Sequence, residues 1–299
     1  MAELILRSKH RPSDADRVPP GKRRIRLTVE FDGTAYSGWQ RQLNAPSIQE
    51  TLESAMEELT GEHLSVIGCS RTDAGVHALG LVCHLDTGCR IPADRLPFAL
   101  NTRLPDDIRV RAGCEAGNGF HARYSTCAKA YRYTFYNARQ MCAIGRQYAA
   151  HVPVQLDEGR MLEAAEALLG THDFAAFAAS GNVSKSTVRT IYALRLWREG
   201  ERVTFQIMGD GFLYNMVRII AGTLAEIGTG KLECDALRRG IESGDRLVLG
   251  TTAPACGLTL EHVFYEGDED QALEMFDSRL TGVRTFESGK DQHGTIWIK

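Results

Sequence analysis

The chain has 299 residues, of which 43% are hydrophobic and 24% charged, and its net charge is −3 at pH 7. This length favours a globular protein of two domains, and the ordinary composition excludes a disordered or fibrous chain. The sequence has no apolar run of about 18 residues, and its charged N-terminus lacks a signal peptide's apolar core, so we predict a cytoplasmic protein without a membrane-spanning helix.

Eight cysteines are scattered along the chain, with no CxxC pair and no histidines at zinc-finger spacing. In a long chain without a secretion signal, this usage predicts reduced thiols that pack as small hydrophobic side chains. We therefore expect no metal site.

Charge is distributed unevenly. From Glu266 onward there are eight acidic and four basic residues, which leaves 30 acids and 31 bases in the rest of the chain. Nucleic-acid binding, which ordinarily uses a basic surface, would need a local patch. Residues 267–299 are predicted to form an acidic C-terminal extension, whose apolar end Thr295–Ile298 is either disordered or an added strand.

The first half of the chain alternates strand and helix patterns. Residues 1–24 are charged and contain three prolines, which predicts a flexible leader. Apolar residues alternate over Ile25–Phe31, as in a strand with one buried face. Ser47 and Glu50 form a capping box before a helix that Gly61 ends. Strands are also expected at 64–69, 79–85 and 108–112, and a short helix at 92–104.

The second half repeats these kinds of element. We predict a strand at 128–136, a helix at 158–169, a hairpin of strands at 190–197 and 203–208, and an apolar helix at 214–227. Hairpin-linked strands with interspersed helices predict an α+β fold on mainly antiparallel sheet. Two similar mixed subdomains, 25–127 and 128–266, are expected to carry helices outside and to enclose a catalytic cleft.

The polar loop Ser70–Ala78 contains both Arg71 and Asp73. Taken alone, it is most simply a turn whose Asp side chain accepts hydrogen bonds from nearby amides.

A second segment, Gly211–Arg218, opens the last long helix. Tyr214, Asn215 and Arg218 are spaced to share one face of that helix. Apolar neighbours surround this face, so a buried Arg218 would need a carboxylate partner. An ordinary structural ion pair is the alternative.

Aromatic and basic side chains are interleaved in Phe120–Arg123 and in Lys129–Tyr133. This arrangement suits a stacking platform for an unpaired base. Equally, alternating aromatic residues could line one face of a strand. Gly170–Phe174 and Pro254–Leu258 are each most simply a cap or a turn.

Together these segments resemble the bacterial tRNA pseudouridine synthase A family, in the family's order over residues 25 to about 265. The matches are Tyr36–Gln42, Ser70–Ala78, Phe120–Arg123, Lys129–Tyr133, Gly170–Phe174 and Gly211–Arg218. The resemblance implies the pseudouridine synthase fold and isomerisation of uridine to pseudouridine at positions 38–40 in the anticodon arm of tRNA. It also implies no cofactor, no metal and a homodimer.

The resemblance assigns roles to individual residues. Asp73 corresponds to the catalytic carboxylate, and Arg218 to the residue that forms an ion pair with it. Tyr131 corresponds to the residue that stacks on the target base and is a candidate for proton transfer. Arg71 corresponds to the arginine that enters the RNA stack, and Leu258 to an apolar residue against the base.

The chemistry of the reaction agrees with these roles. Breaking the bond from C1′ to N1 and rejoining the base at C5 can use a carboxylate as nucleophile or base. A neighbouring arginine would keep that carboxylate ionised in a closed pocket. Whether Asp73 attacks C1′, attacks C6 or removes a sugar proton stays open. A basic groove is expected beside its loop, made of Arg41, Arg71, Arg123, Lys129 and Arg132.

Three alternative functions are weighed against this one. The protein could modify a uridine at another site or in another RNA, or it could be a tRNA-binding chaperone without required catalysis. Asp73, Tyr131 and Arg218 together argue against the chaperone, because simple RNA binding needs no carboxylate near phosphates. A metal-dependent hydrolase is disfavoured because its candidate ligands, His77, His121, His172 and Asp173, lack ligand spacing.

Overall fold

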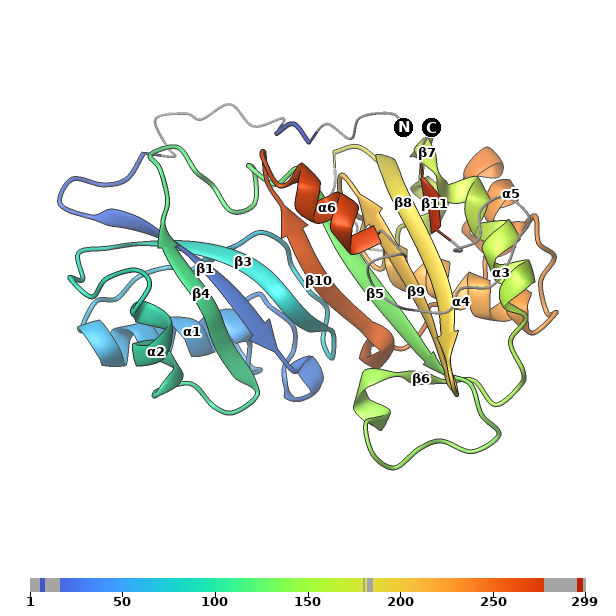
Figure 1. Ribbon diagram of the computed structural model, residues 1–299, viewed down its shortest axis with the longest axis horizontal. Coiled ribbons are helices and arrows are strands. Elements are labelled where there is room, and N and C mark those ends of the chain that lie inside the picture. The colour runs from blue at the N-terminus through green and yellow to red at the C-terminus, as the bar shows by residue number, and fades with distance from the viewer. Residues whose placement is uncertain (1–5, 9–16, 180, 182–184, 277–294, 298–299) are drawn as a thin grey trace. The chain divides into compact units, whose positions relative to one another are not determined.

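The computed structural model describes residues 6–8, 17–179, 181, 185–276 and 295–297. The chain forms two compact units, whose elements are labelled in Figure 1. The N-terminal unit contains Leu6–Cys127 and Thr259–Glu266, and the C-terminal unit contains Ala128–Leu258 and the described residues from Gly267 onward. Each unit carries its own strands, helices and buried side chains.

The sheet of the N-terminal unit is built around β3 (His77–Thr87) and β1 (Arg23–Phe31), which pair antiparallel along most of their length. On its other edge β1 pairs antiparallel with β4 (Ile108–Glu115). β10 (Leu258–Phe264) pairs in parallel with the start of β3, and the short β2 (Ile67–Gly68) pairs antiparallel with β3 further along. Alternating apolar side chains of β1 are fully buried, as the sequence pattern predicts.

Helix α1 (Ile48–Thr60) begins and ends at the predicted signals. The Glu50 N–H donates to Ser47 Oγ at 3.3 Å, and Gly61 closes the helix with φ 72°. The carboxylate of Glu50 lies 3.4 Å from the Arg41 guanidinium, so it forms an ion pair. The serine half of the predicted capping box is thus present, and the glutamate is used elsewhere.

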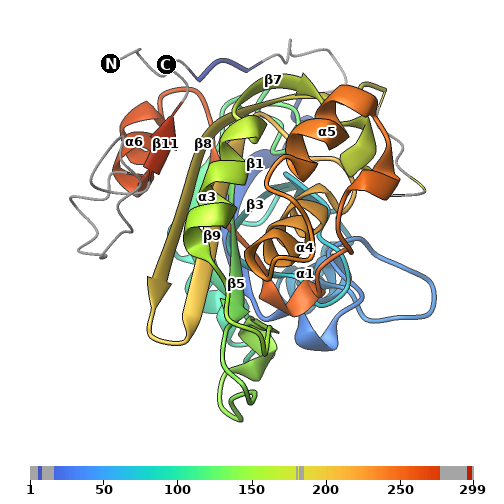
Figure 2. The same cartoon turned by 90° about the vertical axis from the view of Figure 1, so that its right-hand side faces the viewer.

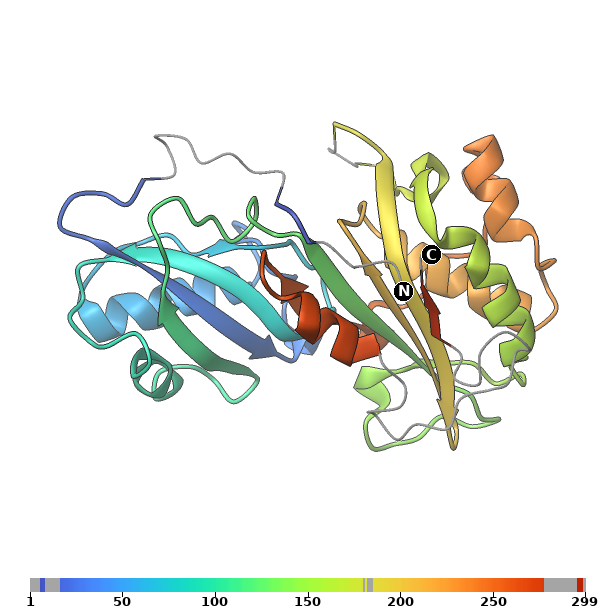
Figure 3. The ribbon, with the colours of Figure 1, turned by 45° about the horizontal axis from the view of Figure 1, so that its top comes forward.

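The sheet of the C-terminal unit is an antiparallel array of β8 (Val188–Glu199), β9 (Arg202–Gly209) and β5 (Ala128–Tyr136). β11 (Thr295–Trp297) adds to the free edge of β8 (Figure 3), which decides between the two predictions for this segment in favour of a strand. Two short strands complete the sheet, β6 (Ala150–His151) on β5 and β7 (Gly170–Asp173) on β8.

Helices α3 (Glu158–Ala165), α4 (Met216–Gly228) and α5 (Ala236–Ser243) lie on one face of this sheet, and α6 (Glu269–Phe276) lies on the other (Figure 2). α4 is the most deeply buried of them, because ten of its side chains or glycines are shielded from solvent. Nowhere in the described ranges is a helix long and apolar enough to cross a membrane.

The predicted class is confirmed: α+β, with mainly antiparallel pairing. The strand at 128–136 and the hairpin of β8 and β9 occur where they were expected. The helix expected at 92–104 is shorter, because α2 covers only Leu96–Asn101. The strand expected at 64–69 is shorter: β2 covers Ile67 and Gly68, and the Cys69 N–H also donates to the Val82 carbonyl of β3.

Two predicted boundaries differ from the structure. The sequence analysis put residues 259–266 with 128–258, whereas they pack in the N-terminal unit. The reason is a pair of long-range contacts: β10 hydrogen-bonds to β3, and the Tyr265 hydroxyl donates to the Ala122 carbonyl at 2.8 Å. The apolar helix begins at Met216 instead of position 214, because Asn215 has a left-handed backbone with φ 62°.

The ends of the chain are described only in part. Of the predicted leader, residues 1–5 and 9–16 lie outside the described residues, while Leu6 is buried and Arg23 and Arg24 already belong to β1. Of the predicted extension, residues 277–294 and 298–299 lie outside them.

Gly222 offers a test of how α4 is seated. A Cβ added there would lie 1.8 Å from the Thr251 carbonyl oxygen, a backbone atom that cannot turn away. We expect Gly222→Ala to lower the free energy of unfolding by at least about 1–3 kcal/mol, the usual cost of overpacking. Thermal and urea unfolding followed by circular dichroism would measure it. The matched control is Gly117→Ala, where nothing lies within 4 Å; equal stability of the two variants would contradict the packing.

Candidate functional site

The loop that carries Asp73 joins β2 to β3 in the N-terminal unit. The Val76 N–H donates to the Asp73 carbonyl at 3.1 Å, so residues 73–76 form a hydrogen-bonded turn. Gly75 occupies the third position with φ 76°, the geometry of a type II turn. The Asp73 side chain is half-buried in this turn, just before β3 begins.

A second loop, residues 33–39, is hydrogen-bonded to this turn, and we call it the supporting loop. The Trp39 N–H donates to the Thr72 carbonyl at 3.2 Å, and the Gly75 N–H donates to the Tyr36 carbonyl at 3.3 Å. Both bonds join backbone to backbone on either side of Asp73. The position of the carboxylate is therefore set by main-chain hydrogen bonds and not by its own side-chain rotamer alone.

Two glycines make this close approach possible. A Cβ on Gly33 would lie 2.0 Å from the Val76 oxygen, and a Cβ on Gly38 would lie 2.2 Å from the Thr72 oxygen. Gly38 also has φ 91°, a conformation that other residues rarely adopt. The supporting loop thus accepts no side chain at either point.

The supporting loop is itself anchored at both ends. The Tyr36 hydroxyl donates to Asp107 Oδ1 at 2.7 Å, and burial together with this acceptor raises the pKa of Tyr36. The Gly33 N–H donates to Nδ1 of His77 at 3.1 Å. His77, at the start of β3, is buried, and the same Nδ1 lies 3.1 Å from Asp32 Oδ1.

The other two candidate histidines also make hydrogen bonds within the protein. Nδ1 of His121 accepts from the N–H groups of Arg123 and Tyr124, and Nε2 of His172 lies 2.7 Å from the Leu169 carbonyl. Over the described part of the chain, no three His, Cys, Asp or Glu side chains are grouped as metal ligands.

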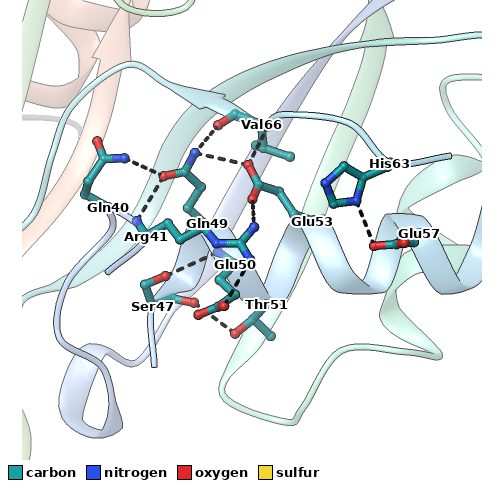
Figure 4. A network of polar contacts seen from close by, with 10 residues as sticks. All are labelled: Gln40, Arg41, Ser47, Gln49, Glu50, Thr51, Glu53, Glu57, His63 and Val66. Atoms are coloured by element: carbon teal, nitrogen blue, oxygen red, sulfur yellow. Dashed lines mark hydrogen bonds and ion pairs between the residues drawn. The ribbon is translucent and has the colours of Figure 1, made fainter. Parts of the chain in front are cut away.

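Arg71 is held by a chain of side-chain amides that the sequence analysis did not identify. Its Nε donates to Oε1 of Gln40 at 3.2 Å, and Nε2 of Gln40 donates to Oε1 of Gln49 at 2.9 Å. Gln49 in turn donates to Glu53 and to the Val66 carbonyl (Figure 4). Nothing in the local sequence links Gln40 and Gln49, nine residues apart, to Arg71.

Arg41, predicted as part of a basic groove, is engaged on helix α1. Its guanidinium lies 3.3 Å from Glu53 and 3.4 Å from Glu50 (Figure 4). These ion pairs offset its charge, so Arg41 adds less positive potential than predicted. Arg71 and Arg123, in contrast, line one depression in the N-terminal unit.

Tyr131 lies on β5 of the C-terminal unit, opposite Ile207 of β9. Its side chain is 6% exposed, and its ring meets that of Phe212 edge-on with centroids 5.2 Å apart. Edge-to-face contact fixes the ring plane, which a stacking residue requires. The sequence analysis assigned no role to Phe212, although it stands in the segment that leads to Arg218.

Arg218 is placed by the start of α4. Its Nε donates to the Ala253 carbonyl and its Nη1 to Asn215 Oδ1, each at 2.8 Å. Asn215 takes a left-handed backbone conformation that Asn tolerates better than most residues, and this brings its side chain back to the guanidinium. The predicted proximity of Asn215 and Arg218 is therefore real, while Tyr214 stands before the helix with an exposed ring.

Leu258 follows a tight turn that is bound to β5. The Tyr133 hydroxyl donates to the Pro254 carbonyl at 2.7 Å, and a Cβ on Gly257 would lie 2.5 Å from the Tyr133 ring. Burial raises the pKa of Tyr133, which keeps this donor protonated. Sγ of Cys256 lies 3.6 Å from the Ala149 carbonyl. The turn thereby sets where Leu258, itself 6% exposed, begins β10.

The predicted site residues thus divide between the two units. Asp73, Arg71 and Arg123 belong to the N-terminal unit. The C-terminal unit carries the remainder, namely Lys129, Tyr131, Arg132, Arg218 and Leu258.

Comparison with known proteins identifies the family. The sequence model described as tRNA pseudouridine synthase matches residues 27–125 and 164–266. The chain belongs to the tRNA pseudouridine synthase family. The matched ranges contain the Asp73 loop, Arg71, Arg123, Arg218 and Leu258, while Tyr131 falls between them.

Curated relatives agree with this assignment. tRNA pseudouridine synthase A of Acetivibrio thermocellus is 51% identical over 81% of this chain and 100% of its own length. The protein of the same name from Clostridium kluyveri is 48% identical over 81% of this chain and 99% of its own. A solved structure of a Cbf5–Nop10–Gar1 complex aligns with 89% of this chain and 59% of its own, at 11% identity and a TM-score of 0.40.

The close fit of the supporting loop predicts a sharp effect of Gly38→Ala. The added Cβ would push on the Thr72 carbonyl and move Asp73, the candidate catalytic residue; a shift of about 1 Å in a reacting group can cost roughly 100-fold in rate. We expect kcat for pseudouridine formation in tRNA to fall by about that factor while tRNA is still bound.

The control for this variant is Gly61→Ala. Gly61 also has a positive φ, 72°, but nothing lies within 4 Å of its Cβ position. Backbone strain alone would affect both variants alike, so an equal loss of kcat in the two would refute the role of the supporting loop.

Proposed function

We propose that this protein isomerises uridine to pseudouridine at positions 38–40 in the anticodon arm of tRNA, with Asp73 as the catalytic carboxylate. One observation carries the proposal: in a chain of this family, an aspartate is the first residue of a turn, and main-chain hydrogen bonds hold the chain on both sides of it. Such pre-organisation is expected of a reacting group, because its position must not change with solvent or rotamer.

The reaction breaks the bond between C1′ and N1 of uridine and forms a new one between C1′ and C5. An ionised Asp73 acts as nucleophile at C1′ or C6, or as the base that removes a sugar proton. Arg218 pairs with this carboxylate and keeps it ionised when RNA excludes water. The two hydrogen bonds from Arg218 to its own unit support the role, because they fix the orientation of the guanidinium.

The target base has to leave the RNA stack, which costs a few kcal/mol. Arg71 enters the space that the base vacates, while Tyr131 stacks on the base and Leu258 covers it. The edge-on contact with Phe212 supports the stacking role of Tyr131, since it holds the ring in one plane. Arg123, Lys129 and Arg132 contact the RNA backbone.

The tRNA-binding chaperone is the second candidate function. It would use the same basic side chains, but it gives no reason for the glycines and main-chain bonds that hold Asp73 in place. A family member that modifies another uridine or RNA would share the whole site, and only the choice of substrate separates the two.

The decisive experiment measures tritium release from tRNA labelled at C5 of uridine, with no divalent metal added. We expect release by the wild type and none by Asp73→Asn, with both proteins binding the tRNA. The control is Asp94→Asn, because this exposed aspartate lies in the same unit and away from the loop. Equal release by Asp73→Asn and wild type would remove Asp73 from the mechanism, and binding without any release would favour the chaperone.

We further propose a cytoplasmic homodimer. The measurement is sedimentation of the purified protein at micromolar concentration, where we expect twice the chain mass of 33.0 kDa. A single species at the chain mass would rule the dimer out.

A further inference from the structure

A small depression opens beside the Asp73 loop, entirely within the N-terminal unit. Trp39, Gln40, Gly68, Ser70, Arg71 and Arg123 line it, and its volume is about 200 Å³. Pockets that enclose a drug-sized molecule usually measure about 300–1,000 Å³. The depression therefore suits one small group and not a whole nucleoside.

The oxygens of the amide side chains around the depression already accept hydrogen bonds within the protein. Oε1 of Gln40 accepts from Arg71, while Oε1 of Gln49 accepts from Gln40 and from the Arg41 N–H. Nε2 of Gln49 donates both of its hydrogens, to Glu53 and to Val66. The second N–H of Gln40 remains as a donor for a ligand.

Trp39 adds a donor from the floor. Its side chain is 2% exposed and packs so tightly on Gly68 that a Cβ there would lie 2.5 Å from the indole ring. Among the described residues no acceptor faces its Nε1–H, yet this atom is not among the buried polar atoms without a partner, so it keeps contact with solvent. The indole N–H is therefore a donor that an acceptor in the depression can reach.

Two uncompensated positive charges stand at the rim. Arg71 bonds to Gln40 through Nε, which leaves both of its Nη groups without a partner among the described residues. The Arg123 guanidinium contacts the Tyr124 ring and no carboxylate in the described part of the chain. The nearby Glu53 does not neutralise them, because its oxygens are taken by Arg41, Gln49 and the Val66 N–H.

We propose that this depression binds one phosphodiester group of the RNA substrate, belonging to a nucleotide next to the target uridine. The inference rests on the proposed function for its substrate. A phosphodiester is anionic and accepts hydrogen bonds without donating any, which matches a site that offers two guanidinium groups, an indole N–H and an amide N–H. A nucleobase, with donors of its own, would leave some of them unpaired.

The place of the site explains its use. Ser70 and Arg71 line the depression and lead directly into Asp73. A phosphate bound there would fix the backbone on one side of the displaced nucleotide, at the point where Arg71 enters the stack. Gln40, itself held by Gln49, orients the Arg71 guanidinium through Nε, and the two Nη groups remain for the RNA.

The test uses full-length tRNA with uridines at positions 38–40, in which single phosphates of the anticodon arm are replaced by neutral methylphosphonates. We expect one replacement to weaken binding to the wild-type protein roughly tenfold, as for loss of a hydrogen bond to a charged group. Arg123→Gln should weaken binding of unmodified tRNA similarly and reduce the slope of log K against log salt by about one. The same methylphosphonate should then cause no further loss of affinity in this variant.

Two more variants complete the design. Trp39→Phe removes the indole N–H and keeps an aromatic ring. We expect that the methylphosphonate that weakens binding to the wild type will not weaken binding to this variant further. Arg90→Gln removes an exposed charge of the same unit and should retain the wild-type response. If Trp39→Phe does not fold, as judged by circular dichroism, the exposed Arg123 carries the test alone.

Each result decides the proposal. Two results would rule out a phosphate site in the depression, even if tritium release upholds the proposed function. In the first, no single methylphosphonate weakens binding more than the others. In the second, the most damaging replacement weakens binding to Arg123→Gln as much as binding to the wild type. If the phosphate signal is present and tritium release is absent, the phosphate site stands and the proposed catalysis fails. A wild-type protein that binds no tRNA overturns both.

Discussion

The main-chain hydrogen bonds that tie the loop of residues 33–39 to the turn of Asp73 are the constraint on which the candidate site depends. They join Trp39 to Thr72 and Tyr36 to Gly75, one on each side of the aspartate. They form only because Gly33 and Gly38 have no side chain at the points of closest approach. Folding therefore orients the carboxylate before any RNA is bound, so RNA binding does not have to supply the free energy for this.

The C-terminal unit positions its functional side chains by the same principle. Arg218 is bound to the Ala253 carbonyl and to Asn215, and Gly222 allows the same helix to lie against the backbone of Thr251. These two bonds to neutral oxygens fix the orientation of the guanidinium. Tyr131 is held comparably by an aromatic edge.

Local chemistry resolves the conflict between a negative net charge and an RNA substrate. The total of −3 includes the acidic residues concentrated from Glu266 onward, and two more acids, Glu50 and Glu53 on α1, form ion pairs with Arg41. Arg71 and Arg123 remain around one small depression. Binding strength in such a protein depends on which charges lack an internal partner, and a count over the sequence cannot reveal that.

The sequence by itself determined the α+β class, the caps of α1, the central strands and the motif around Asp73, because periodicity, capping and turn residues act within a few positions of the chain. Only the tertiary structure decided that residues 259–266 join the N-terminal unit, that Arg41 is ion-paired and that two glutamines aim Arg71. Each of these is a contact between residues that folding brings together from afar or turns toward one another. A local pattern carries no information about such contacts, since their geometry depends on the whole packed unit.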